Sequence, residues 1–246
     1  VWNVPEDAAI IGATGASAII AAIPRVLPKG EVCIPGPTYN EHGAAFSASG
    51  WELGQEPSHV TVAVQPNNPD GHRWQPEALT TPYVIIDESF CDVMPDASLI
   101  HLAARPGTVV LKSFGKFWGM AGLRLGFAIG DPKIIGKLTD LLGPWQVSGP
   151  ALAIGAEALS DPQWADETRA RLTSDAAQLD GLMTNKGASL VGGTSLFRLY
   201  DVGDAQTLQN HLAKHHVWSR CFPYAPQWLR LGLPAPERWD QLQSAL

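Results

Sequence analysis

A lysine, a serine and an arginine are spaced so that they present an amine beside an anion site. Ser113 precedes Lys116 by one helical turn and Arg124 follows it by eight residues, in a run that also contains four glycines. An uncharged lysine amine attacks aldehydes, and a nearby cation or a dry pocket lowers its pKa towards neutrality. Arginine grips phosphate bidentately, and glycines let backbone approach a flat ring. The alternative is a solvated loop lysine, which these neighbours disfavour.

Three more side chains with possible binding roles follow apolar runs. Asp87 comes directly after Val84-Ile85-Ile86, and Asn68 lies in the turn after residues 60–64. An acid at the end of an apolar run is costly if it is buried alone, so we expect a partner for Asp87 unless it is solvated. Tyr39 follows a Pro-Gly-Pro turn, at the kind of position where open α/β sheets bind ligands. It either stacks on a cofactor ring or covers the core.

A glycine loop lies between two apolar runs near the start of the chain. Residues 12–17 follow a short apolar stretch at 8–11 and lead into the apolar run 18–23, which is typical of a strand, a loop and a helix. Free amides at such a helix start bind phosphate. No Gly-Lys-Ser/Thr closes the loop, so it is not a P-loop. A plain helix cap by Thr14 or Ser17 explains the pattern equally well.

These elements predict an α/β fold in two parts. Short strands alternate with helical stretches up to about residue 135, which indicates a mostly parallel sheet. Residues 133–186 are mainly helical. The strands expected at 190–191, 195–200 and 228–232 surround a helix at 205–215 and make a small α+β unit. We therefore expect a large domain at 1–157 and a small one at 158–246.

Composition narrows the function classes. The chain has 246 residues, is 45% hydrophobic and carries a formal net charge of −7, without a basic run. This argues against nucleic acid as a partner, and no apolar window is long enough for a membrane span. Cys33, Cys91 and Cys221 are odd in number and show no Cys-x-x-Cys spacing, so we expect neither a disulfide framework nor a zinc site, and no other metal. A reducing cytoplasm suits them.

Taken in order, these motifs resemble those of a known family over nearly the whole chain. The glycine loop, Tyr39, Asn68-Pro69, Asp87, the lysine run and the late Arg230 are similar to the fold-type I, pyridoxal 5′-phosphate (PLP) dependent enzymes of aminotransferase classes I and II. The resemblance implies an α/β fold with a mostly parallel central sheet, helices on both faces and a small α+β domain at the carboxyl end.

The resemblance also implies a role for each site residue. Lys116 forms the Schiff base with the cofactor, and Asp87 pairs with the pyridine nitrogen, so that the ring accepts electrons from a breaking bond. Asn68 hydrogen-bonds the ring hydroxyl and Tyr39 stacks on the ring. The cofactor phosphate is held by Ser113 and Arg124 and by the amides around Thr14, Gly15 and Ala16. Arg230 binds the substrate α-carboxylate.

Two departures from the family stand out. Phe90 occupies the place of a tyrosine whose hydroxyl reaches the cofactor in many relatives, so we expect that contact to be absent. Family members usually carry a longer segment before the glycine loop, which lends an aromatic residue to the neighbouring subunit. This sequence lacks that segment, so we expect a fragment or a shortened relative.

Residues 218–224 and 228–234 resemble the cobalamin-pathway branch of the family. This implies decarboxylation of an amino acid phosphate, L-threonine O-3-phosphate, to (R)-1-amino-2-propanol O-2-phosphate by a cytoplasmic homodimer. One alternative is amino transfer of the histidinol-phosphate type. Another is a PLP-binding protein without activity.

Overall fold

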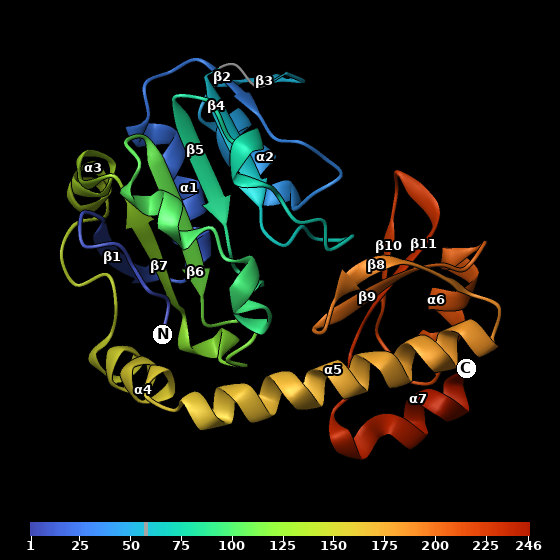
Figure 1. Cartoon of the computed structure of the whole chain (residues 1–246). Coiled ribbons are helices and arrows are strands. Elements are labelled where there is room, and N and C mark those ends of the chain that lie inside the picture. Colours follow the sequence, from blue (N-terminus) through green and yellow to red (C-terminus); the bar gives the residue numbers. More distant parts are fainter. Residues whose placement is uncertain (57–58) are drawn as a thin grey trace. The chain divides into compact units, whose positions relative to one another are not determined.

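The computed structural model describes residues 1–56 and 59–246 of the chain (Figure 1). The chain divides into two compact units. The first comprises residues 1–68 and 73–162, and the second comprises residues 69–72 and 163–246. The domain boundary expected between residues 157 and 158 stays a prediction.

The first unit is built on a seven-stranded sheet with the order β1-β7-β6-β5-β4-β2-β3. Strands β2 to β6 run parallel, while β7 is antiparallel to both β6 and β1. The strands are β1 (Ala9–Thr14), β2 (Glu31–Cys33), β3 (Glu52–Gly54), β4 (Val60–Val64), β5 (Tyr83–Asp87), β6 (Thr108–Ser113) and β7 (Leu125–Gly130). The mostly parallel sheet predicted from the sequence is confirmed.

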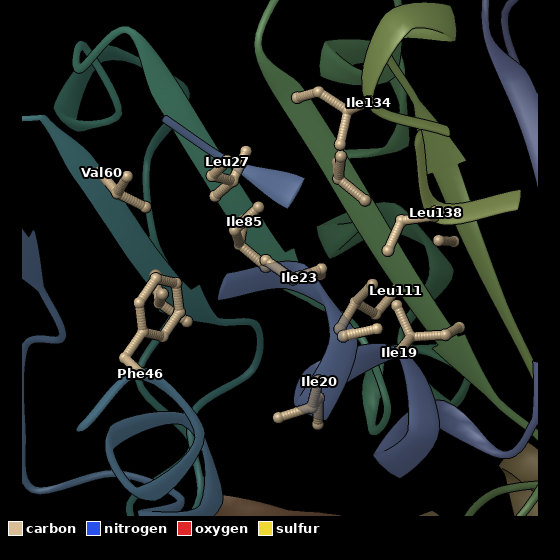
Figure 2. Close-up of a cluster of buried hydrophobic side chains, with 14 of the residues drawn as sticks. Ile19, Ile20, Ile23, Leu27, Phe46, Val60, Ile85, Leu111, Ile134 and Leu138 are labelled. Atoms are coloured by element: carbon tan, nitrogen blue, oxygen red, sulfur yellow. The ribbon is translucent and has the colours of Figure 1, made fainter. Parts of the chain in front are cut away.

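Helices cover one face of this sheet. They are α1 (Ala16–Val26), α2 (Asn40–Ala48) and α3 (Pro132–Leu142), and α4 (Gly149–Leu159) follows along the chain. Figure 2 shows α1 residues Ile19 and Ile23 packed over Ile85 and Leu111 of the sheet. The core forms there because strands buried on both faces are apolar at every position, and alternate side chains point to opposite faces.

The opposite face packs against the 3-10 helix η4 (Ile100–Ala104). Further short 3-10 helices of the first unit are η1 (Pro76–Ala78), η2 (Cys91–Val93), η3 (Pro95–Ala97) and η5 (Ala121–Leu123). Val84, Ile86 and Val110 of the sheet pack on this side with Ile100 of η4, and Trp2 of the amino-terminal connector joins the same cluster.

The strand directions bring four strand ends to one edge of the sheet. β4, β5 and β6 are parallel, and β1 points the same way because two antiparallel pairings separate it from β6. Thr14 pairs with Leu125, and Ser113 pairs with the next residue, Gly126. Ligands of open α/β sheets bind at the carboxyl ends of their strands, so the predicted site residues gather at this edge.

The second unit is a four-stranded antiparallel sheet with helices. The strand order is β10-β11-β9-β8, with β8 (Ser189–Thr194), β9 (Phe197–Asp201), β10 (Arg220–Phe222) and β11 (Ala225–Gly232). Its helices are α5 (Pro162–Asn185), α6 (Ala205–Lys214), η6 (Pro236–Arg238) and α7 (Trp239–Ala245). Leu179 of α5, Tyr200, Leu212 and Leu229 meet in its core.

Local chemistry explains several helix starts. Asp131, Ser148 and Asp204 each accept a hydrogen bond from a backbone amide in the first turn of α3, α4 and α6. α1 begins differently, because its cap residue Gly15 has φ of 82° and offers no side chain. Within the part of the chain that the structure describes, no helix has the length and apolar character of a membrane span.

We expect Leu111→Ala to destabilise the first unit strongly. Leu111 is 0% exposed in the cluster under α1, so truncation leaves a cavity and should lower the free energy of unfolding by about 2–5 kcal/mol. The matched control is Leu53→Ala, because Leu53 is 51% exposed on β3. Urea unfolding of both variants measures this difference, and equal losses would show that the core is placed wrongly.

Candidate active site

One pocket of the first unit collects most of the predicted site residues. It lies where β1, β4, β5 and β6 end, and α1 begins beside it. The predicted residues that line it are Gly15, Ala16, Tyr39, Asn68, Asp87, Ser113, Lys116 and Arg124. Ser17, Ser89 and Phe90 line it as well. Residues that were predicted from the sequence and lie up to more than 100 positions apart, such as Gly15 and Arg124, therefore meet in one pocket.

Two predicted residues do not line this pocket. Thr14 is the last residue of β1, and its hydroxyl donates to the Gln146 carbonyl at 2.6 Å. Arg230 lies on β11 in the second unit, with its guanidinium carbon 5.3 Å from the centre of the Phe197 ring. Their roles toward a cofactor or substrate stay predictions.

The anion side of the pocket lies at the start of α1. Gly15 brings the backbone so close to Arg124 that a Cβ on this glycine would be 2.7 Å from the guanidinium. Arg124 itself has φ of 54°, and one of its nitrogens donates to the Ala121 carbonyl at 3.1 Å. The first amides of a helix have no partner within the helix and attract anions. An exposed guanidinium, these amides and the Ser113 hydroxyl make a cradle suited to a phosphate.

Asp87 supplies a buried negative charge on another wall. One carboxylate oxygen lies 2.8 Å from His42 Nε2, and the other accepts from the Ser89 amide at 2.9 Å and the Ser89 hydroxyl at 2.5 Å. Burial alone would raise the pKa of this carboxyl, but the hydrogen bond and charge of His42 and the bonds from Ser89 outweigh burial and lower the pKa. The partner that the sequence led us to expect for Asp87 is therefore present.

Lys116 supplies an exposed amine to the pocket. It follows Ser113, the last residue of β6, in a turn, and its ammonium lies 5.3 Å from the centre of the Phe90 ring. An ammonium over an aromatic face at this distance is a favourable cation–π contact. The aromatic face of Phe90 thus takes the place of the hydroxyl expected in relatives. An amine, a phosphate cradle and a buried carboxylate together could hold a flat, phosphorylated aldehyde.

Sequence reasoning missed His42 and Ser89. His42 is buried on α2, three residues after Tyr39, and its ring lies edge-on to the Tyr39 ring with 6.1 Å between the ring centres. The signal was a histidine one helical turn after the predicted stacking residue. Ser89 stands two residues after Asp87. This is the spacing of an Asx turn, in which an aspartate side chain accepts a hydrogen bond from the backbone amide two residues on.

We expect the stability difference between the wild-type chain and Asp87→Asn to depend on pH. The pKa of Asp87 is lower in the folded than in the unfolded chain, so its charge stabilises the fold above about pH 4. This contribution is lost as the pH falls through the lower folded pKa. The difference in free energy of unfolding should shrink as the pH falls from about 5 to about 2, as measured by urea titration. A constant difference would contradict an ionised Asp87.

Two curated relatives carry the same name. The chain is 38% identical to the threonine-phosphate decarboxylase of Pseudomonas aeruginosa, over 96% of this chain and 77% of the relative. It is 35% identical to the threonine-phosphate decarboxylase of a Sinorhizobium species, over 91% of this chain and 72% of the relative. The sequence identity to a histidinol-phosphate aminotransferase of Symbiobacterium thermophilum is lower, at 27%.

Solved structures share the fold. Histidinol-phosphate aminotransferase from Clostridium acetobutylicum superposes with a TM-score of 0.87 at 18% identity, over 98% of this chain and 83% of that one. The enzyme of the same name from Sinorhizobium meliloti, in complex with pyridoxal-5′-phosphate, gives 0.81 at 18%, over 96% and 75%. L-threonine-O-3-phosphate decarboxylase from Porphyromonas gingivalis gives 0.81 at 17%, over 96% and 82%. The predicted fold class is thus confirmed.

A family model described as aminotransferase class I and II matches residues 53–246. The matched segment holds Asp87 at the end of β5, Ser113 at the end of β6, Lys116 in the turn after β6, and the whole of the second unit. The resemblance noted in the sequence is confirmed. The chain therefore belongs to the class I and II aminotransferase family.

Proposed function

We propose that this chain removes the carboxyl group of L-threonine O-3-phosphate as carbon dioxide and leaves (R)-1-amino-2-propanol O-2-phosphate. The observation that carries the proposal is the 38% identity to a threonine-phosphate decarboxylase over 96% of the chain. A second relative of that name, at 35% identity, supports it. The product belongs to cobalamin biosynthesis, the pathway that the sequence resemblance implied.

The cofactor is PLP, as in the family to which the chain belongs. When bound, PLP supplies an electron sink for the bond that breaks at the substrate Cα. The pocket fits such a group in three respects. Gly15 leaves room that a side chain would fill, Asp87 keeps a negative charge on a buried wall, and Lys116 stands exposed between them.

Each pocket residue then has a definite task. Ser113, Arg124 and the amide of Ala16 would bind the cofactor phosphate, whereas the Gly15 amide donates to the Ala13 carbonyl at 2.6 Å. Asp87 would accept a hydrogen bond from the pyridine N–H, because a charged carboxylate at this place favours the protonated ring. His42 and Ser89 keep Asp87 charged and oriented.

Tyr39, Asn68 and Lys116 are the remaining pocket residues with a proposed role. Tyr39 stacks on the ring, and Asn68 orients its hydroxyl by a hydrogen bond. Lys116 would hold the cofactor covalently when no substrate is present. In its protonated, ammonium form Lys116 could instead deliver a proton to the substrate Cα.

The second unit supplies cations suited to an anionic substrate. Arg220 and Arg230 stand opposite each other on β10 and β11. Burial, followed by the charge of Arg220, lowers the pKa of Arg230. Like charges directly opposite on a sheet repel, and an anion between them removes the repulsion. We propose that Arg230 binds the substrate α-carboxylate and that an amino acid phosphate suits this pair.

Amino transfer of the histidinol-phosphate type is the second candidate. It is favoured by the histidinol-phosphate aminotransferase of Symbiobacterium thermophilum, which matches 100% of the chain at 27% identity. The two reactions differ in which bond is held perpendicular to the ring, the bond to the carboxylate or the bond to hydrogen. A chain that binds PLP without turnover is the third candidate.

A homodimer and a cytoplasmic location are part of the proposal. Trp145 is 95% exposed, and Leu152 and Ile154 on α4 also face solvent within the first unit. Large apolar side chains left exposed suit a contact surface between subunits. The three cysteines are unpaired, which suits a reducing compartment.

We expect the PLP-loaded chain to release label from carboxyl-labelled L-threonine O-3-phosphate. The Asp87→Asn variant, which retains the shape of the side chain but not its charge, should release label at least about 100-fold more slowly, since about 2.7 kcal/mol of transition-state stabilisation corresponds to this factor. Trapping of carbon dioxide measures the rate. Amino transfer to 2-oxoglutarate with no label released would replace the proposal by the second candidate, and neither reaction would favour the third.

A further inference from the structure

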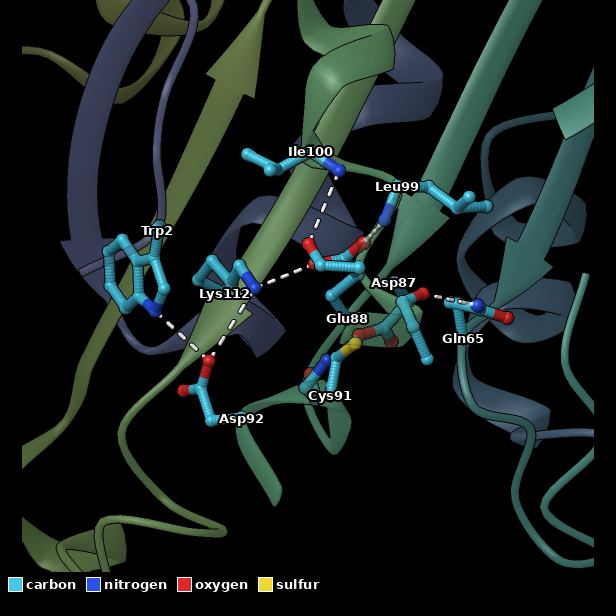
Figure 3. A network of polar contacts seen from close by, with 12 residues as sticks. Trp2, Gln65, Asp87, Glu88, Cys91, Asp92, Leu99, Ile100 and Lys112 are labelled. Carbon is cyan, nitrogen blue, oxygen red and sulfur yellow. Dashed lines mark hydrogen bonds and ion pairs between the residues drawn. The ribbon is translucent and has the colours of Figure 1, made fainter. Parts of the chain in front are cut away.

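A second group of buried charges lies behind the pocket. Lys112 on β6, Glu88 after β5 and Asp92 on η2 are 2%, 0% and 5% exposed (Figure 3). Lys112 Nζ lies 2.6 Å from Glu88 Oε2 and 3.5 Å from Asp92 Oδ1. None of the three lines the pocket. The proposed reaction makes no use of them. Glu88 and Lys112 are nevertheless next to pocket residues in the sequence, and Asp92 contacts Lys112.

The partners of the two carboxylates differ. Glu88 accepts hydrogen bonds from the Ser98 hydroxyl at 2.7 Å and the Leu99 amide at 2.5 Å, in addition to its contact with Lys112. Asp92 accepts from two indole groups, Trp2 Nε1 at 3.0 Å and Trp118 Nε1 at 2.7 Å. Glu88 is thus held by its own loop, whereas Asp92 joins segments that are distant in the sequence.

The charge on Lys112 is held by the carboxylates of Glu88 and Asp92. Burial alone would lower the pKa of the Lys112 ammonium, but the charges of Glu88 and Asp92 outweigh burial and raise it. One buried cation therefore faces two buried carboxylates. An arrangement with one surplus negative charge is costly unless further donors bind it, and the two indole N–H groups are those donors.

Trp118 stands two residues after Lys116 and fixes the turn that presents it. Its ring stacks on Phe114 with 5.7 Å between centres and an angle of 22°. Phe117 meets the same ring edge-on at 5.1 Å. Phe114, Phe117 and Trp118 are all buried, whereas Lys116 among them is exposed. Three buried aromatic rings thus anchor the turn, while the Lys116 side chain is exposed.

We propose that Asp92 is a positioning residue for Lys116, which it orients by holding the Trp118 indole N–H from behind the pocket. The inference rests on the proposed function in one respect, that Lys116 is the residue that carries PLP. Stacking alone leaves an aromatic ring free to turn about its own normal. The hydrogen bond to Asp92 Oδ2 selects one orientation of Trp118, and the backbone of the turn follows it.

Trp2 offers a matched control. Its indole N–H binds the same carboxylate at 3.0 Å, and its ring lies edge-on to Phe114 with 6.1 Å between centres. It belongs to the amino-terminal connector and is far from Lys116 in the sequence. Trp2→Phe and Trp118→Phe therefore each remove one indole donor from Asp92 and retain an aromatic ring, but only the second alters the lysine turn.

The test compares PLP attachment in the wild-type chain, Trp118→Phe, Asp92→Asn, the double variant and Trp2→Phe. For each, total bound PLP is measured by dialysis, the fraction trapped on Lys116 by borohydride is measured by peptide mass, and the thermal midpoint is recorded. We expect Trp118→Phe and Asp92→Asn each to lower the trapped fraction of bound PLP by roughly three- to ten-fold, the range that loss of one hydrogen bond allows. The double variant should fall no further, while Trp2→Phe should stay within about two-fold of the wild type, since its bond does not lead to the turn.

The outcomes separate the inference from the proposed function. A wild-type chain that traps no PLP on Lys116 contradicts the proposed function and removes the basis of the inference. Trapping in the wild type with an unchanged fraction in Trp118→Phe overturns the inference alone. So does a trapped fraction that follows the thermal midpoint in all variants, Trp2→Phe included, because that shows only a structural role. If Trp118→Phe does not fold, Asp92→Asn decides by the same readout.

Discussion

The ionised carboxylate of Asp87 is the constraint on which the arrangement of the pocket depends. A buried carboxylate persists only if hydrogen-bond donors surround it. At Asp87 these donors come from His42 on α2 and from Ser89 directly after β5. Because they originate from different elements, the charge can be kept only if α2 packs at the end of β5. That packing also places Tyr39, the cap residue of α2, on the pocket wall.

The parallel strands place the residues that follow them at one edge of the sheet. Val64 pairs with Asp87, so β4 and β5 end at the same level, and Asp87 pairs with Leu111, so β6 runs two residues further to Ser113. Lys116 and Arg124 are exposed. Lys112 is buried and contacts the buried carboxylates of Glu88 and Asp92 (Figure 3).

The sequence predicted the strands well and some helices poorly. The strands expected at 195–200 and 228–232 correspond to β9 and β11, because their apolar runs stand out from the turns around them. Helix α2 was not predicted, since its only buried side chains are His42 and Phe46 and its apolar pattern is weak. The three-residue strand β10 is too short to show any alternation.

For the site, too, local patterns in the sequence were predictive and long-range contacts were not. Lys116, Asp87 and Arg124 were predicted from their runs and from the family resemblance, and the structure places all three in one pocket. The pairing of His42 with Asp87 spans 45 residues, and that of Trp118 with Asp92 spans 26, so both depend on the fold rather than on a local pattern. A single sequence contains the two members of such a pair but offers no signal that they meet.

The most direct test of this account is covalent attachment of PLP to the purified chain. PLP is added, the visible absorption is recorded before and after borohydride, and the reduced protein is digested for mass mapping, with Lys116→Ala as the control. The account predicts a borohydride-sensitive visible band, reduction that adds the cofactor to Lys116, and neither in the variant. A label spread over exposed lysines, or an equal band in Lys116→Ala, would contradict it.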